Sequence, residues 1–252
     1  MSKRGQATIF IIIGLVIAIL IILIFFVRNA FFFGPVTTEN LQKELSPIQQ
    51  HIITCTEDVS PDYIEKLGLQ GGYLLTPEDS YRLYESNQIS YLCYDIQNSP
   101  LCYNRMLTKE HMEKELAESI NFGLMQCLDI MSFKKYNYEL ILGERNTEVA
   151  IGKDNIIVDV NYPITIKKGD VEVSISDVSV PLDYPLGRLY ETSQDILDVE
   201  TEFGEFDQLT YMLAKKGQII IDKKRPYPDK LYILRAKDNP YIFQFFIQDE
   251  PS

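Results

Sequence analysis

An uncharged stretch of 21 residues, 7–27, constrains this chain more than any other feature of its sequence. Ile and Leu dominate the stretch, and Thr8 is its one distinctly polar side chain. A helix of this length measures about 31 Å at a rise of about 1.5 Å per residue, which matches the hydrocarbon core of a bilayer. In lipid a helix is required because it satisfies its own backbone hydrogen bonds. The sequence therefore predicts one transmembrane helix, ended by Gly34 and Pro35.

The charges that flank this stretch predict its orientation. Lys3 and Arg4 precede it, and only Arg28 follows closely. Positively charged flanks stay on the cytoplasmic side, so we expect a cytoplasmic N-terminus and an extracytoplasmic C-terminal part. No small-x-small cleavage site follows the stretch, which indicates that the helix stays attached as a single-pass anchor in the cell membrane.

The remainder of the chain is strongly acidic. The first acidic residue is Glu39, and beyond the anchor 21 Lys and Arg oppose 36 Asp and Glu, a net charge of −15. Nucleic acid phosphates and anionic headgroups repel such a surface. This charge excludes nucleic acid as a partner and favours protein, cation or glycan partners, although it also serves simply to keep the domain soluble.

Four cysteines lie in this part: Cys55, Cys93, Cys102 and Cys127. An even number of cysteines outside the cytoplasm indicates two disulfides, for which three pairings exist. We favour Cys93–Cys102, which would close a loop containing Asn98-Ser99-Pro100, and Cys55–Cys127, which would join two helices. The alternative is a zinc site with four thiolate ligands, but the spacings contain no C-x-x-C pair.

Hydrophobic periodicity predicts an α+β fold with helices packed on an antiparallel sheet. Residues 1–34 are expected to form the leader and transmembrane helix, 35–135 a helical, cysteine-containing region, and 136–252 an α+β domain. Helices are expected at Thr38 to about Cys55 (with a kink or break at Pro47), Pro61–Leu67, Thr108–Met131, Leu186–Phe203 and Asp207–Ala214. Strands are expected just after Gly72 and at Tyr138–Leu142, Glu148–Ile151, Ile156–Tyr162, Ile164–Lys167, Val171–Ser176, Val178–Leu182, Gln218–Ile221, Lys230–Arg235 and Tyr241–Ile247.

Two details of this pattern bear on packing. In the helix at Leu186–Phe203 the predicted buried positions are Leu189, Ile196, Leu197, Val199 and Phe203. Hairpin turns are expected at residues 152–155 and 168–170, because Gly, Asn and Asp favour tight turns.

Residues 76–107 are predicted to be rich in loops and carry a concentration of tyrosines. Tyrosine combines an apolar ring with a polar tip, which suits a recognition surface and equally suits packing around a disulfide loop. The candidate binding surface comprises Tyr81, Tyr84, Tyr91, Tyr94 and Tyr103.

Catalytic signatures are missing from the sequence. It contains no P-loop, G-x-G-x-x-G, H-E-x-x-H or G-x-S-x-G motif, and two histidines leave little capacity for general base catalysis. Asp222, Asp229 and Asp238 do not have the D-x-D-x-D spacing of a calcium loop. We therefore expect a protein without catalytic residues, metal or cofactor.

The residues Lys3-Arg4-Gly5-Gln6-Ala7-Thr8-Ile9-Phe10 resemble the class III signal of archaeal type IV prepilins. In that family a short basic leader ends in Gly, cleavage falls before Gln, and a hydrophobic helix follows. The resemblance covers about 25 residues and implies processing between Gly5 and Gln6. Many pilins carry a Glu at the position occupied here by Phe10, and that Glu helps to register subunits in a filament. The remainder of the chain is similar to uncharacterised membrane-anchored proteins of small-genome archaea, which implies an archaeal envelope setting.

Three functions remain open from the sequence. The first is a non-enzymatic cell-surface protein, either a pilin-like filament subunit that self-assembles through its N-terminal helix or an envelope scaffold. The second is an anchored extracellular binding module that recognises a protein or glycan through its tyrosine-rich disulfide loop. The third is an enzyme of unseen type that uses acidic residues. In each case the lipid bilayer is the expected partner of residues 7–27.

Overall fold

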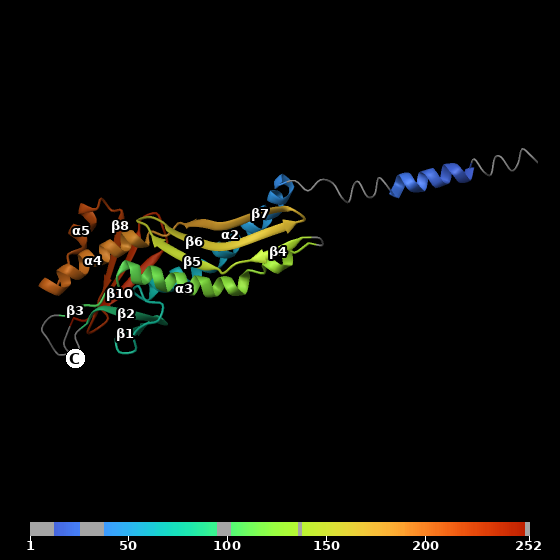
Figure 1. The fold of residues 1–252 in the computed structure, drawn as a ribbon. Coiled ribbons are helices and arrows are strands. Elements are labelled where there is room, and N and C mark those ends of the chain that lie inside the picture. Colours follow the sequence, from blue (N-terminus) through green and yellow to red (C-terminus); the bar gives the residue numbers. More distant parts are fainter. Residues whose placement is uncertain (1–12, 26–37, 95–101, 136–137, 250–252) are drawn as a thin grey trace, which may run out of the picture.

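The computed structural model describes residues 13–25, 38–94, 102–135 and 138–249. Residues 38–249 form an elongated α+β domain, as the sequence predicts at the level of fold class. Figure 1 shows two long helices running along one sheet, with a second sheet and two further helices gathered at one end. Within the described residues the strands form a four-stranded and a six-stranded sheet.

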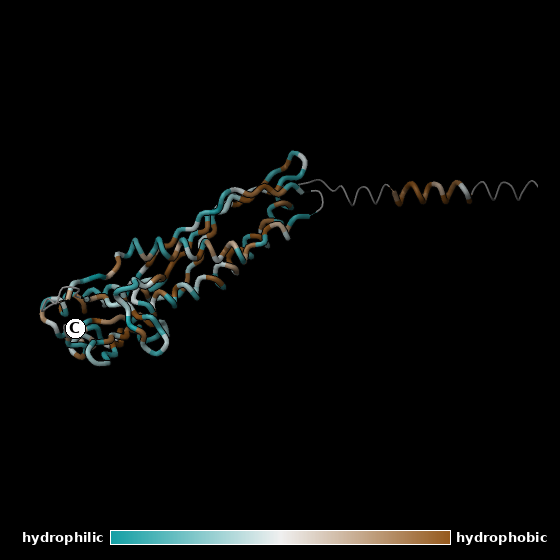
Figure 2. The backbone as a smooth tube through the Cα atoms, turned by 90° about the horizontal axis from the view of Figure 1, so that it is seen from below, coloured by the Kyte–Doolittle hydropathy of each residue, from teal (hydrophilic) through white to brown (hydrophobic). Residues whose placement is uncertain are grey.

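Residues 13–25 are helical and lie within the predicted transmembrane stretch. Figure 2 draws most of this helix in brown, and its large apolar side chains are exposed, with Phe25 at 68 %. Across the described parts of the chain, no helix combines the length and the apolar character needed to cross a membrane. The ends of the predicted span, 7–12 and 26–27, lie outside the described residues, as do Gly34 and Pro35.

Helix α2 (Thr38–Leu69) runs for 32 residues, about 48 Å at the usual helical rise. One face of it is buried along the whole length, from Leu41 through Ile52 to Leu67. This face contacts β6 and β7 of one sheet and β2 and β10 of the other. Helix α2 is therefore the element that the two sheets share.

The predicted break at Pro47 and the separate helix at Pro61–Leu67 are wrong, because α2 continues through both prolines. A proline inside a helix removes one hydrogen bond and costs about 3 kcal/mol. Burying a Leu or Ile side chain contributes about 1.5–3 kcal/mol. The buried face carries six of them, so packing outweighs the two prolines: Leu41, Leu45, Ile48, Ile52, Ile64 and Leu67.

Strand β6 is the central strand of the four-stranded sheet. Strands β4 and β5 pair with the second and first halves of one of its edges, and β7 pairs along the other edge. Every pairing in this sheet is antiparallel. Its strands are β4 (Glu139–Leu142), β5 (Asn146–Ile151), β6 (Ile156–Lys168) and β7 (Val171–Leu182). The predicted turns at 152–155 and 168–170 join these strands as expected. Sequence patterning split β6 and β7 into two strands each. Both are continuous, because a register shift between Asn161 and Ile164 carries the pairing across the interruption.

Helix α3 (Lys109–Cys127) packs against α2 and β5, so the two helices cover the buried face of this sheet. Its N-cap is Thr108, whose hydroxyl accepts a hydrogen bond from the His111 backbone N–H at 3.3 Å. The helix ends four residues earlier than predicted, and a 3₁₀ helix η1 (Ile130–Phe133) follows it.

The six-stranded sheet has the order β1-β2-β10-β9-β8, with β3 also paired to β2. Its strands are β1 (Tyr81–Tyr84), β2 (Asn87–Tyr94), β3 (Tyr103–Asn104), β8 (Ile219–Lys224), β9 (Lys230–Ala236) and β10 (Ile242–Ile247). The prediction of a loop-rich segment at 76–107 is therefore wrong. Strand β2 pairs in parallel with β10, which lies about 150 residues away, so no local hairpin pattern reveals it.

The region 35–135 thus contains strands as well as helices, and one hydrophobic core joins it to residues 136–252. The strand expected after Gly72 is absent from the described structure at that point. Residues 70–75 form turns and bends instead, in which Gly71 and Gly72 adopt positive φ values of 73° and 93°.

Helix α4 (Leu186–Phe203) has the predicted bounds, and α5 (Gln208–Ala214) begins after its predicted first residue, Asp207, which caps it. Leu189, Ile196 and Leu197 are buried as expected. Phe203 is 69 % exposed, which corrects the prediction for that residue, and Val199 is half-buried. The buried position in the last turn is instead Glu200.

All four cysteines are paired, and the pairing is the favoured one. The Cys55–Cys127 disulfide joins α2 to the last residue of α3, with a Cα–Cα distance of 6.0 Å. The Cys93–Cys102 disulfide joins β2 to the residue before β3, with a Cα–Cα distance of 5.2 Å. The zinc alternative is therefore excluded for these thiols.

Replacing both cysteines of one disulfide with Ser should destabilise the domain by an amount set mainly by loop length. The Cys55–Cys127 bridge spans 72 residues and Cys93–Cys102 spans nine. Loop-closure entropy predicts losses of about 4 and about 2.5 kcal/mol, respectively, in the free energy of unfolding. Urea unfolding of the two double variants measures this difference. An equal loss, or a larger loss for the nine-residue loop, would contradict loop length as the main determinant of the stabilisation.

Candidate functional site

Three of the five predicted tyrosines, Tyr84, Tyr91 and Tyr94, lie close together on β1 and β2 of the six-stranded sheet. Tyr84 of β1 and Tyr91 of β2 pack on the buried ring of Phe246, with centroid distances of 6.2 and 5.4 Å. Tyr94 lies 5.1 Å from Tyr91. Together with buried Ile89 and Leu231, the rings of Phe246, Tyr84 and Tyr91 form a second hydrophobic cluster that we call the Phe246 cluster. Tyr84 and Tyr91 therefore contribute to packing within the six-stranded sheet, and recognition by the five tyrosines stays a prediction.

The hydroxyl of Tyr91 is engaged inside the domain. It donates a hydrogen bond of 2.6 Å to the Asp229 carboxylate, which also accepts a 2.7 Å hydrogen bond from Arg82. Burial and this carboxylate raise the pKa of Tyr91 well above its ordinary value. The Tyr91 hydroxyl is consequently not free to bind a partner, as the predicted binding role would require. Asp229 is an ion-pair partner of Arg82 rather than a calcium ligand.

The other predicted site residues are dispersed. Tyr81 is half-buried on β1, opposite Ser90, whereas Tyr103 is 58 % exposed on β3. The tip of the Cys93–Cys102 loop, residues 95–101, lies outside the described residues, so recognition through this loop stays a prediction. Gly5 and Gln6, the predicted processing site, also lie outside them.

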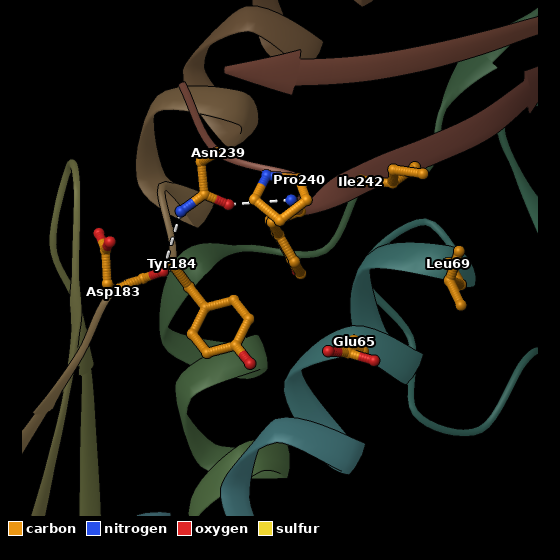
Figure 3. Close-up of a pocket in the computed structure, with 8 residues that line it drawn as sticks. Glu65, Leu69, Asp183, Tyr184, Asn239, Pro240 and Ile242 are labelled. Atoms are coloured by element: carbon orange, nitrogen blue, oxygen red, sulfur yellow. Dashed lines mark hydrogen bonds between the residues drawn. The ribbon is translucent and has the colours of Figure 1, made fainter. Parts of the chain in front are cut away.

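A cavity of about 470 Å³, which the sequence did not indicate, lies between α2, the β7–α4 connection and the β9–β10 turn. We call it the Tyr184 cavity. Glu65 and Leu69 line it from α2, Asp183 and Tyr184 from the connection, and residues 239–242 from the turn and the start of β10. Figure 3 shows the Tyr184 side chain extending toward α2, where Glu65 lies, while the Asp183 carboxylate points away from Tyr184.

Several polar groups around the Tyr184 cavity already have partners. The Asn239 amide donates to the Asp183 backbone oxygen at 3.0 Å and accepts from the Tyr241 backbone N–H at 2.9 Å. The Tyr241 hydroxyl donates to the backbone oxygen of Ile64 at 3.1 Å, and its ring meets that of Tyr184 edge-on at 5.2 Å. These bonds fix the cavity wall, and they engage neither the Glu65 carboxylate nor the Tyr184 hydroxyl.

A buried ionic network at the C-terminal end of α4 was also missed. Lys230 of β9 is 1 % exposed, and its ammonium lies 3.0 Å from Glu200 and 2.8 Å from Asp249. Glu200 is equally buried, and it accepts hydrogen bonds from the Tyr232 hydroxyl and from the Phe206 backbone N–H. Glu200 lies at helical spacing from Ile196 and Leu197, so a carboxylate on an apolar helix face was the sequence signal for a buried partner.

The titration behaviour of the network follows from its contacts. Burial acts to lower the pKa of Lys230, but hydrogen bonds to Asp249 and Glu200 outweigh it, so this pKa is raised. Glu205, whose carboxylate lies 3.4 Å from the Lys230 ammonium, also belongs to the network. Burial acts to raise its pKa, but hydrogen bonds from Lys223 and Arg225 outweigh burial and lower the pKa to about 2. Lys230 and Glu205 are thus held in their charged forms, and the contacts of the network form a structural tie between α4, β8, β9 and the end of β10.

Metal-binding geometry is not present in the described parts of the chain, where no three His, Cys, Asp or Glu side chains gather in a way that could hold an ion. Comparison with known proteins finds no matching family model, no matching curated protein and no matching solved structure. The fold and the sites themselves therefore carry the functional argument.

Replacing Lys230 with Met should leave the Glu200 carboxylate buried without its cation. Removing one partner of a buried ion pair costs about 3–5 kcal/mol, so we expect a loss of that size in the free energy of unfolding. The double variant Lys230→Met/Glu200→Gln should be more stable than Lys230→Met alone, because the fully buried carboxylate of Glu200 is then no longer charged. The partly exposed Asp249 keeps Arg225 at 3.4 Å. Thermal and urea unfolding measure both effects.

The matched control is Lys114→Met, which removes a lysine that is 76 % exposed and lies 3.9 Å from Glu118. This variant should change stability by less than about 1 kcal/mol. If Lys230→Met were no more costly than Lys114→Met, the network would have no structural role.

Proposed function

We propose that this protein is a non-enzymatic, membrane-anchored protein of an archaeal cell surface, with its acidic domain outside the cytoplasm. The observation that carries the proposal is the uncharged stretch 7–27, within which the helix at 13–25 exposes its large apolar side chains. Contiguous apolar surface of this kind requires a covering phase or partner. Lys3 and Arg4 before the stretch, against Arg28 alone close after it, favour the N-in orientation.

The disulfides and the net charge also support a location of the domain outside the cytoplasm. Two disulfides persist in oxidising surroundings such as the cell exterior and are rare in the cytosol. A net charge of −15 beyond the anchor suits a soluble surface domain. The main features of the domain stabilise its fold: the shared helix α2, the two disulfides and the Lys230 network. This predominance of structural features favours a scaffold or filament subunit over an enzyme.

A finer part of the proposal is pilin-like processing. The residues Lys3-Arg4-Gly5-Gln6 form a short basic leader directly before the apolar stretch. In this reading a peptidase cleaves between Gly5 and Gln6, and the mature helix then anchors the domain or assembles with other copies.

The full-length protein should sediment with membranes and stay there after alkaline carbonate washing. Alkylation before and after reduction should show all four cysteines oxidised. The control variant Ile17→Arg/Ile21→Arg places two charges in the centre of the stretch, each of which opposes insertion by about 2.5–3.5 kcal/mol, and it should move to the soluble fraction. A wild-type chain that is soluble with four free thiols would remove the anchor and its exterior placement.

Processing is tested by the mass of the mature protein from an archaeal host. The wild-type chain should begin at Gln6, whereas Gly5→Leu should retain the leader, because the peptidase would need a small residue at the cleavage site. Ala7→Leu, which keeps Gly5 and Gln6 intact, is the matched control and should still be cleaved. If the wild-type chain keeps residues 1–5, the pilin-like part of the proposal fails and the plain anchor remains.

A further inference from the structure

The Tyr184 cavity has the size and the wall of a small-ligand site. Its volume of about 470 Å³ lies within the range of about 300–1,000 Å³ that is typical of such sites. Leu69, Pro240 and Ile242 contribute aliphatic surface, and Tyr184 and Tyr241 contribute rings. A ligand that fills this cavity needs an apolar body, because most of the wall offers no hydrogen bonds.

The charge of the cavity determines which polar group the ligand can carry beside its apolar body. Glu65 and Asp183 are both among its lining residues, with the Asp183 carboxylate pointing away from Tyr184, and no Lys, Arg or His is among them. Figure 3 places Glu65 across the cavity from Tyr184. The negative charges of Glu65 and Asp62 reach Tyr184 and, together with burial as the main cause, raise the pKa of its hydroxyl. An anion would meet repulsion at this point, whereas a cation gains both the carboxylate and the tyrosine ring.

The hydrogen bonds of the cavity wall leave acceptors available for one cationic group of a ligand. Asn239 and the Tyr241 hydroxyl are used internally, as described above. Within the described structure, no hydrogen bond engages the Glu65 carboxylate or the Tyr184 hydroxyl. A carboxylate and a phenol oxygen are both acceptors, and an ammonium group carries three donors.

We propose that the Tyr184 cavity binds an alkylammonium group, that is, an aliphatic chain ending in a protonated primary amine. The aliphatic part contacts Leu69, Pro240 and Ile242, and the ammonium lies between Glu65 and Tyr184. The same chemistry is offered by free amines and by lysine side chains of a partner polypeptide. This inference is independent of the membrane anchor, because the cavity lies wholly within residues 65–242.

The test is saturation-transfer NMR on the purified full-length protein, with n-butylammonium, butyrate and butanol as probes of equal length. We expect saturable binding of butylammonium, weaker binding of butanol and no saturable binding of butyrate. Added NaCl should weaken the binding of butylammonium, because the carboxylate is exposed to solvent. Butyrate binding as tightly as butylammonium, or an absence of saturable binding by butylammonium, would overturn the proposal.

Variants locate the site. Glu65→Gln should raise the dissociation constant for butylammonium by about two- to fivefold, as expected for a solvent-exposed ion pair. The matched control Glu57→Gln removes the same charge from an exposed position two turns earlier on α2 and should leave the constant unchanged. Tyr184→Ala should weaken binding by about fivefold or more, with an unchanged circular dichroism spectrum. Equal effects of Glu65→Gln and Glu57→Gln would show non-specific attraction and overturn the proposal.

A second arm distinguishes the two sources of the amine. Nα-acetyl-lysine methylamide presents the same ammonium with a peptide backbone attached. Tighter binding of this compound than of butylammonium assigns the cavity to a lysine of a partner polypeptide, and weaker binding assigns it to free amines. Both outcomes support the alkylammonium chemistry.

Discussion

The structure depends on the burial of one face of α2 against two sheets at once. The helix contacts β6 and β7 in the four-stranded sheet and β2 and β10 in the six-stranded sheet, and one hydrophobic core includes residues from all of them. Two prolines within the helix weaken it locally, but its buried aliphatic side chains outweigh them. The Cys55–Cys127 disulfide then ties the middle of α2 to the end of α3. Residues 38–249 are thus built around a shared helix.

How far the sequence predicted this fold follows from the range of the interactions involved. Local pattern was sufficient for α4, for the capped start of α3 and for the hairpins of the four-stranded sheet, because caps, turns and alternation lie within a few residues of each element. It was insufficient for β1–β3. Strand β2 is buried on both faces, so it shows no alternation, and its partner β10 is remote in the chain. The continuity of α2 was missed because proline is a local signal, whereas the packing that overrides it is tertiary.

The candidate sites also divide into features that local sequence indicates and features that depend on tertiary contacts. The disulfide pairing could be favoured from cysteine spacing, and the tyrosines were identified as a group. The partners of Tyr91 are remote in the chain, because Phe246 lies on β10 and Asp229 immediately precedes β9. The Tyr184 cavity is assembled from three distant segments and carries no motif. The Lys230 network had one trace in the sequence, a carboxylate on an apolar helix face at Glu200. The partners in each of these missed features are residues far apart in the chain, and local pattern does not identify them.

Hydrogen exchange measured by mass spectrometry on the Ile52→Ala variant tests the central role of α2 most directly. Ile52 is fully buried in the middle of the helix, and truncating such a side chain costs about 2–5 kcal/mol. If α2 unites the two sheets, the amides of β6–β7 and of β9–β10 should lose protection together and by the same factor. Faster exchange confined to one sheet, with the other unchanged, would show that the sheets are stabilised independently and would contradict this account.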